Sequence, residues 1–223
     1  AGFTGKESFR PGFPLLLLGL GLWWAFVFDA PMLMKLLAPQ GTATLSSIAL
    51  ALSSGIAFVF VGAGLAALLS LLPRAIFRTL LVLLNVLGAL SFAAAFLYGT
   101  AMTPDMVRNF LATGPAESAG YLGARPVFVF LWVLIPPLWL SLRGQVPPLL
   151  SLGSGKRALM KRLGLRLGGA LLCAFAGVLV IALNFQAFSS AMRNDKTLRY
   201  QIAPVNVVYS TIRTFAADES PDA

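Results

Sequence analysis

Three polar residues in an otherwise apolar chain have the types and the spacing needed to bind a charged head group. Asn109, Thr113 and Glu117 stand four residues apart in the polar stretch 98–121, which reads YGTAMTPDMVRNFLATGPAESAGY. On one continuous helix they would share a face, because residues four apart lie one above the other. Glu117 would pair with an ammonium while Asn109 and Thr113 donate to phosphate oxygens, in bonds worth about 1.5–3 kcal/mol each. Such a face selects a zwitterionic head group but does not catalyse its transfer.

The residues around this triad predict where its helix begins and leave open where it ends. Thr-Pro-Asp at 103–105 predicts a helix start, with a Thr N-cap, Pro at the first helical position and an acid near the positive end of the dipole. Pro115 could break that helix and begin a second one that carries Glu117. The alternative interpretation is a solvated loop, in which Thr113 caps a helix and Glu117 lies in its first turn.

The elements that must position the triad are membrane spans. The chain has 223 residues, of which 58% are hydrophobic and only 11% charged, a composition that no water-soluble domain of this size requires. A spanning helix needs about 20 apolar residues. Five segments meet this requirement, at about 13–37, 45–72, 75–98, 126–142 and 163–190. We therefore expect an all-α polytopic protein with a five-helix transmembrane domain at 1–192 and short interfacial helices.

Several residues inside these segments predict local features. Asp29, Pro31 and Lys35 mark an end or a kink in the first segment, and two adjacent prolines at 136–137 predict a kink in the fourth. Asn85 is interpreted as an interhelical hydrogen-bonding residue without a functional role. Three glycines of the second segment are interpreted as sites of close helix packing, namely Gly55, Gly62 and Gly64.

The distribution of charge predicts the orientation. The net charge is +9, and the connections on the side of the N-terminus hold ten Lys and Arg against Glu7 alone, while the other side holds seven of each sign. Because cytoplasmic connections collect Lys and Arg, the N-terminus is expected inside, and the polar stretch 98–125 and the C-terminus outside. Membrane topology accounts for the basic balance, so a nucleic-acid partner is not expected. With no histidine and with Cys173 as the single cysteine, the usual ligands of a zinc site are lacking.

The C-terminal part differs from the spans before it. Residues 193–223 mix apolar, aromatic and charged side chains and end in an acidic stretch that contains a proline. We expect a segment that lies in the membrane interface, followed by the start of a linker to an extracytoplasmic domain.

Two sequence patterns identify a family. The pattern Y-G-x-x-M-x-x-D-M-x-x-N-x-x-x-T-x-x-x-E begins at Tyr98, and L-R-Y-x-I-x-P-x-N-x-x-Y-S begins at Leu198. Together they resemble the phosphoethanolamine transferases that modify lipid A, which include the mobile colistin resistance enzymes. The resemblance extends over the N-terminal membrane domain of that family.

The resemblance implies an inner-membrane enzyme of Gram-negative bacteria that moves phosphoethanolamine from phosphatidylethanolamine to a lipid A phosphate and so gives polymyxin resistance. It implies zinc and a threonine nucleophile in a periplasmic domain outside this chain, where the threonine would form a phosphoenzyme that passes its group to lipid A. The positions that match the family's head-group contacts are Asn109, Thr113 and Glu117, with Tyr98 as a weaker match. By this reasoning the chain folds, contacts membrane lipids and its own periplasmic domain, and turns over nothing alone.

Two other classes of function are alternatives. The chain could be a complete, non-enzymatic lipid-binding or assembly subunit, which a stop codon directly after Ala223 would favour. A small transporter has less support, because the five segments show no internal repeat and few buried charges.

Overall fold

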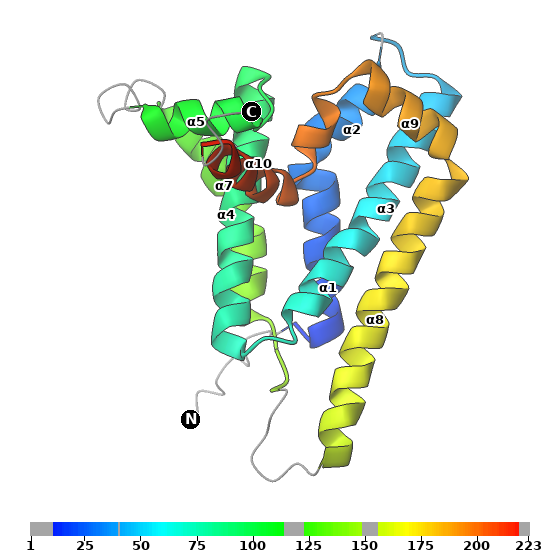
Figure 1. The fold of residues 1–223 in the computed structure, drawn as a ribbon, viewed down its shortest axis with the longest axis vertical. Helices are drawn as coiled ribbons and strands as arrows, with labels where there is room; N and C mark the ends of the chain where they lie inside the picture. The colour runs from blue at the N-terminus through cyan, green and yellow to red at the C-terminus, as the bar shows by residue number, and fades with distance from the viewer. Residues whose placement is uncertain (1–10, 40, 114–122, 149–155, 219–223) are drawn as a thin grey trace, which may run out of the picture.

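A bundle of long helices with shorter helices at one end forms the computed structural model (Figure 1). The structure describes residues 11–39, 41–113, 123–148 and 156–218, and the regular elements within these ranges are all helical. In chain order they are α1 (Phe13–Trp23), the π-helical turn η1 (Trp24–Phe28), α2 (Ala30–Leu37), α3 (Leu45–Leu69), α4 (Arg74–Tyr98), α5 (Pro104–Ala112), α7 (Ala124–Arg143), α8 (Lys156–Leu183), α9 (Phe185–Asn194), the 3₁₀ turn η2 (Leu198–Gln201) and α10 (Val205–Asp218).

The long helices confirm the predicted class of all-α polytopic membrane protein. Within the described ranges, α3, α4, α7 and α8 are each long and apolar enough to cross a membrane. The pair formed by residues 13–28 and α2 passes the same test together and makes a fifth span if it is counted as one. Many large apolar side chains on these helices are exposed in the isolated chain, as expected for surfaces that face lipid.

The first span is bent where the sequence predicted an end or a kink. Residues 13–28 and α2 meet at an angle of 57°, and the break is at Asp29, whose backbone (φ −89°, ψ 3°) departs from helical geometry. Pro31 lies in the first turn of α2, where its missing N–H costs no hydrogen bond.

The fifth predicted segment, 163–190, has wrong boundaries. The helix α8 begins at Lys156 and ends at Leu183, and α9 is a separate helix after Asn184, whose backbone (φ −115°, ψ 22°) is not helical. The prediction followed the apolar run, but the basic residues at 156–166 interrupt that run without ending the helix, so α8 begins before the predicted segment. At the other end, the polar residues of α9 belong to a surface helix.

The C-terminal residues form helices and pack on the bundle. The sequence predicted an interfacial segment and the start of a linker over 193–223, and η2 and α10 extend the helical structure to Asp218. Residues 219–223 lie outside the described ranges.

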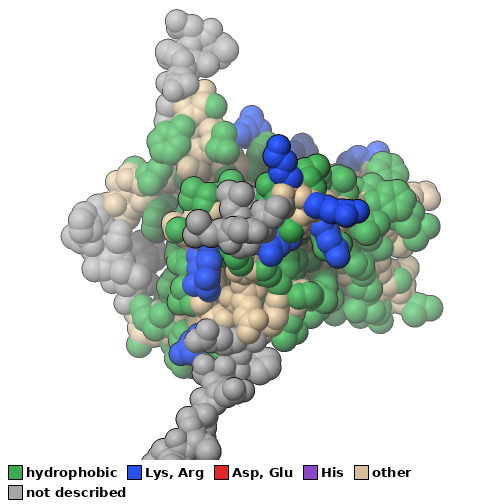
Figure 2. Space-filling view, turned by 90° about the horizontal axis from the view of Figure 1, so that it is seen from below, with side chains coloured by type: hydrophobic (Ala, Val, Ile, Leu, Met, Phe, Trp, Pro, Cys, Tyr) green, Lys and Arg blue, Asp and Glu red, His purple; other side chains and the backbone are tan. Residues whose placement is uncertain are grey.

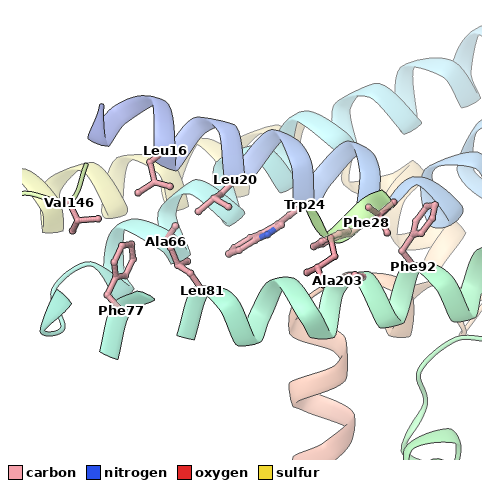
Figure 3. Packing of buried hydrophobic residues seen from close by; sticks show 13 residues of the cluster. Leu16, Leu20, Trp24, Phe28, Ala66, Phe77, Leu81, Phe92, Val146 and Ala203 are labelled. Carbon is pink, nitrogen blue, oxygen red and sulfur yellow. The ribbon is translucent and has the colours of Figure 1, made fainter. Parts of the chain in front are cut away.

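Small residues bring the spans together around α3, which packs against both α1 and α8. A Cβ added at Gly62 of α3 would lie 3.2 Å from the Cα of Gly21 in α1, and one added at Gly21 would lie 2.5 Å from the Val59 carbonyl oxygen. The predicted packing role of the glycines is confirmed, since Gly55 also meets the Phe26 ring and Gly64 meets α8. The apolar core beside this contact joins α1 and η1 to α4 through residues that include Leu20, Trp24, Phe28 and Leu81 (Figure 3).

Asn85 links three helices, as the sequence predicted. The Trp24 indole N–H donates to Asn85 Oδ1 at 2.8 Å, and Asn85 Nδ2 donates to Ser141 Oγ at 2.8 Å and to the Pro137 carbonyl at 3.2 Å. Both prolines lie inside the continuous helix α7. The missing N–H of Pro137 leaves the Val133 carbonyl without its helical donor, and the Trp23 indole N–H donates to that carbonyl at 3.0 Å.

Candidate functional site

The candidate site is built on α5, a short helix after the end of α4. The Thr103 side chain accepts a hydrogen bond from the Met106 N–H at 3.3 Å, Pro104 opens the helix and Asp105 lies in its first turn. The predicted helix start is therefore confirmed in each of its three parts.

The single helical face proposed for the triad is not formed by α5. The helix ends at Ala112, and Thr113 is its C-cap with an extended backbone (φ −71°, ψ 124°). A helical hydrogen bond still joins the Thr113 N–H to the Asn109 carbonyl at 2.9 Å, and the Thr113 hydroxyl donates to the same carbonyl at 2.7 Å. Glu117 lies outside the described residues, so its place relative to this pair stays a prediction.

The described candidate residues Asn109, Thr113 and Tyr98 have exposed apolar side chains near them in the sequence. Asn109 is exposed, Thr113 is half-buried, and Tyr98 is the last residue of α4, with 49% of its surface exposed. Phe110 and Leu111 of α5 are about as exposed as Tyr98, and Val107 is buried. A polar amide beside exposed apolar side chains suits the boundary between lipid chains and head groups.

The C-terminal helix α10 fixes α5 against the bundle through polar residues that the sequence patterns did not mark as a site. Asn206, Ser210 and Thr214 are all buried. Asn206 Nδ2 donates to Ser91 Oγ of α4 at 2.8 Å. The Ser210 hydroxyl donates to the Met102 carbonyl at 2.6 Å and the Thr214 hydroxyl to the Pro104 carbonyl at 3.0 Å, directly before and at the start of α5. The two family-like patterns, about eighty residues apart, are thus in contact.

Two signals in the sequence could have revealed this contact. Asn206, Ser210 and Thr214 are spaced four residues apart, which puts them on one face of a helix. Asn206 and Ser210 also belong to the second of the two patterns that identified the family.

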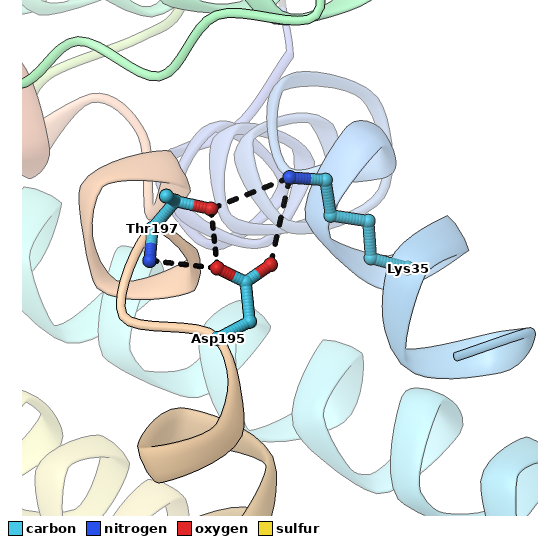
Figure 4. A network of polar contacts seen from close by, with 3 residues as sticks. All are labelled: Lys35, Asp195 and Thr197. Carbon is cyan, nitrogen blue, oxygen red and sulfur yellow. Dashed lines mark hydrogen bonds and ion pairs between the residues drawn. The ribbon is translucent and has the colours of Figure 1, made fainter. Parts of the chain in front are cut away.

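The segment between α9 and α10 is fastened to the bent first span. Lys35 of α2 lies 3.7 Å from Asp195 Oδ2, and Thr197 donates to Asp195 Oδ1 from its hydroxyl at 2.6 Å and its backbone N–H at 2.8 Å (Figure 4). Further along, the Ala203 N–H donates to the buried Asp29 carboxylate at 2.6 Å. These contacts join α10, and through it α5, to the break in the first span.

The described part of this region has the chemistry of a binding surface. No group of three or more His, Cys, Asp or Glu that could hold a metal occurs among the described residues. The exposed side chains of α5 are those of Asp105, Arg108 and Asn109 together with apolar ones, and they can hold a polar lipid but include no nucleophile with an adjacent base.

Fold and site together define the chain as a helical membrane domain with a braced surface helix. The family whose description reads "Phosphoethanolamine transferase EptA/EptB" matches residues 59–218, a range that runs from α3 to the end of α10. The chain belongs to this phosphoethanolamine transferase family and corresponds to its membrane domain, as the two sequence patterns predicted.

A solved structure supports the assignment of the fold. The chain is similar to the integral membrane protein lipooligosaccharide phosphoethanolamine transferase A (EptA) from Neisseria meningitidis, with a TM-score of 0.81 and 17% sequence identity. The match covers 96% of this chain and 38% of that protein, so the chain spans well under half the length of this relative. At this identity the likeness shows the fold alone. No curated protein matches the sequence.

Proposed function

We propose that the chain is the membrane domain of an enzyme that transfers phosphoethanolamine from phosphatidylethanolamine to a lipid A phosphate, and so gives resistance to polymyxins. The observation that carries this proposal is the family match over residues 59–218, which includes both α5 and α10. The nucleophile and the zinc would belong to a periplasmic domain outside this chain. The membrane domain would anchor that domain and present lipid to it.

The proposed substrate contacts are Asn109, Thr113, Glu117 and Tyr98. Asn109 is exposed on a helix whose start is held by α10, so its amide is available to a phosphate oxygen. Exposed Phe110 and Leu111 on the same helix would lie against the acyl chains of the bound lipid. Glu117 supplies the carboxylate that an ammonium requires.

The proposed orientation places α5 on the periplasmic side of the inner membrane. Lys and Arg side chains gather at the opposite end of the bundle, and no acidic side chain is in view there among the coloured residues (Figure 2). By the positive-inside rule, that end and the N-terminus would be cytoplasmic. A C-terminal reporter that is active only in the cytoplasm should therefore be silent.

The test is Asn109→Ala in the full-length protein, scored by the mass of lipid A extracted from cells. The loss of a hydrogen bond to a charged group should lower the fraction of modified lipid A about tenfold or more, and Glu117→Gln should act in the same direction. The matched control is Asn194→Ala, an equally small change at an exposed asparagine that ends α9.

Each outcome decides one part of the proposal. Wild-type levels of modified lipid A in Asn109→Ala, at equal expression, would show that Asn109 is not a required contact. If cells with the wild-type full-length protein contain no modified lipid A, the transferase proposal itself fails and the non-enzymatic lipid-binding subunit takes its place.

A further inference from the structure

A pocket lined by three arginines lies at the end of the bundle opposite α5. It has a volume of about 330 Å³ and is formed where α4 begins and α7 ends. Its lining consists of Arg74, Arg78, Leu142, Arg143, Gly144 and Gln145. The pocket is separate from the proposed substrate site, and its assignment does not rest on the proposed function.

Two hydrogen bonds to backbone carbonyls hold this pocket in shape. Arg78 Nη2 donates to the Gly144 carbonyl at 3.2 Å, and the Gln145 N–H donates to the Pro11 carbonyl at 2.8 Å. Gly144 cannot carry a larger side chain here, because an added Cβ would lie 2.8 Å from the Leu140 carbonyl oxygen and 2.9 Å from Leu16. The turn after α7 is therefore closed tightly against α1, and it brings Arg143 beside the first turn of α4.

The charge of the pocket is unbalanced within the described part of the chain. None of its three guanidinium groups forms an ion pair with a described carboxylate. The Arg78 Nε atom is buried and has no hydrogen-bond partner among the described residues. A buried donor without an acceptor is unfavourable, and a bound anion would supply the missing acceptor.

The start of α4 adds to the same preference. Its N-cap is Pro73, which provides no side-chain acceptor, and Arg74 is the first helical residue. The first-turn N–H groups and the positive end of the helix dipole favour an anion at this position. Guanidinium groups bind the oxygens of a phosphate in pairs, so the lining matches a phosphate group.

The surroundings of the pocket favour a lipid as the source of such a phosphate. Ile76 of α4 and Trp139 and Leu142 of α7 are each about half exposed, within one turn of the arginines along their helices. Apolar side chains next to a phosphate site provide a surface for acyl chains. A zwitterionic head group would bring an ammonium close to three guanidinium groups, which repel it.

We infer that the pocket of Arg74, Arg78 and Arg143 binds the phosphate of an anionic phospholipid, whose acyl chains run along α4 and α7. Basic pockets between spans are a known means of holding acidic lipids, and each basic residue near such a head group contributes about 1 kcal/mol, or about fivefold in affinity.

The experiment measures lipid binding to the purified protein by native mass spectrometry after titration with lipids of identical acyl chains. The probes are phosphatidylglycerol, phosphatidylethanolamine and phosphatidylcholine. We expect phosphatidylglycerol to bind best to the wild-type protein. Changing Arg74, Arg78 and Arg143 together to Gln should weaken its binding at least tenfold and abolish the preference over the other two lipids.

A matched variant separates a formed pocket from diffuse attraction by the basic end. Lys156, Arg157 and Lys161 are exposed in the first turns of α8, and their joint change to Gln removes the same charge from outside the pocket. Binding of phosphatidylglycerol to this control should fall by less than threefold. Equal losses in the two triple variants would overturn the inference, and so would the absence of a head-group preference in the wild-type protein.

Two further measurements cover the remaining outcomes. If inorganic phosphate at millimolar concentration displaces the lipid completely, the pocket is a site for a free anion and the lipid assignment is wrong. If the triple variant does not fold, Arg143→Gln replaces it, since Arg143 is exposed at the very end of α7. That single change should weaken phosphatidylglycerol binding about fivefold, and no change in binding would contradict the inference.

Discussion

Two sets of polar residues with the same four-residue spacing differ in burial and in hydrogen bonding. Asn206, Ser210 and Thr214 on α10 are buried and donate to groups on other elements, whereas Asn109 is exposed and Thr113 bonds only back to its own helix. The spacing of polar residues therefore predicts a common face but not the partner of that face. The difference arises from what lies opposite: α10 packs on α4 and α5, while Asn109 of α5 is exposed.

This difference gives each pattern its own task. The buried residues of α10 determine where α5 lies, since two of them bond to carbonyls at its start. The exposed residues of α5 keep hydrogen-bonding capacity for a ligand. Changes in α10 should therefore lower stability first, and changes in α5 should lower function without lowering stability.

The largest expected effect is that of Asn206→Ala. Asn206 bonds to Ser91 Oγ, to the Tyr200 carbonyl at 2.5 Å and, through Oδ1, to the Val207 N–H at 2.7 Å. Removing the amide leaves these buried groups without partners and should lower the free energy of unfolding by about 2–3 kcal/mol. The measurement is chemical denaturation of the purified protein in detergent.

Asn109→Ala is the matched comparison for this change. Its side chain is exposed, so the same substitution should alter the free energy of unfolding by less than about 0.5 kcal/mol. If Asn206→Ala and Asn109→Ala lower the free energy of unfolding equally, the distinction between the buried residues of α10 and the exposed residues of α5 is wrong.

A smaller effect is expected from Thr214→Val, which keeps the shape of the side chain and removes its hydroxyl. That hydroxyl bonds to the Pro104 carbonyl at 3.0 Å and to the Ser210 carbonyl at 2.9 Å in a buried position. We expect a loss of about 1 kcal/mol in the same denaturation experiment. The equivalent Thr113→Val on α5 should be close to neutral, and a larger loss there than at Thr214 would reverse the comparison.

The sequence was sufficient for the parts of the fold that depend on local chemistry. The long apolar helices, the break at Asp29, the cap formed by Thr103 and the contacts of Asn85 each follow from residue type and immediate neighbours. The packing of the C-terminal segment was not predicted, because Asn206, Ser210 and Thr214 look in the sequence like polar residues of a segment in the membrane interface. Their burial depends on carbonyls at 102 and 104 that α4 and α5 place beside them, and no local pattern carries that information.

The end of α5 shows the same limit at the candidate site. The alternation of Asn109, Thr113 and Glu117 is compatible with one helix, and Pro115 alone did not decide where it ends. In the structure the backbone leaves the helix already at Thr113, where the hydroxyl satisfies the Asn109 carbonyl. Thr113, whose spacing from Asn109 suggested a shared helical face, thus forms a local hydrogen bond to the Asn109 carbonyl where the helix ends.

The smallest expected effect concerns charge, and it isolates the one described ion pair that fastens the segment leading to α10. Burial raises the pKa of the Asp195 carboxyl, but the hydrogen bonds from Thr197 and the charge of Lys35 lower it more, so its pKa lies below the ordinary value of 3.8. A lowered pKa means that this carboxylate stabilises the fold above pH 3.8 and ceases to do so as the pH falls through the folded-state pKa. Because both side chains are about 40% exposed, solvent screens the pair and the contribution at pH 7 is about 0.5 kcal/mol.

Asp195→Asn should therefore lower the free energy of unfolding slightly at pH 7 and not at all below the folded-state pKa. Lys35→Gln should cause a smaller part of the same loss, and the double variant should lose less than the sum, because the two residues share one interaction. High salt should reduce the difference at pH 7. The hydrogen bonds of Asn206, Ser210 and Thr214 involve no ionisable group, so the cost of Asn206→Ala should be the same at both pH values. If the loss of stability caused by Asn206→Ala is also smaller at the lower pH, a titrating group takes part in the packing of α10. The neutral contacts of α10 are then not independent of the charged contact at Asp195.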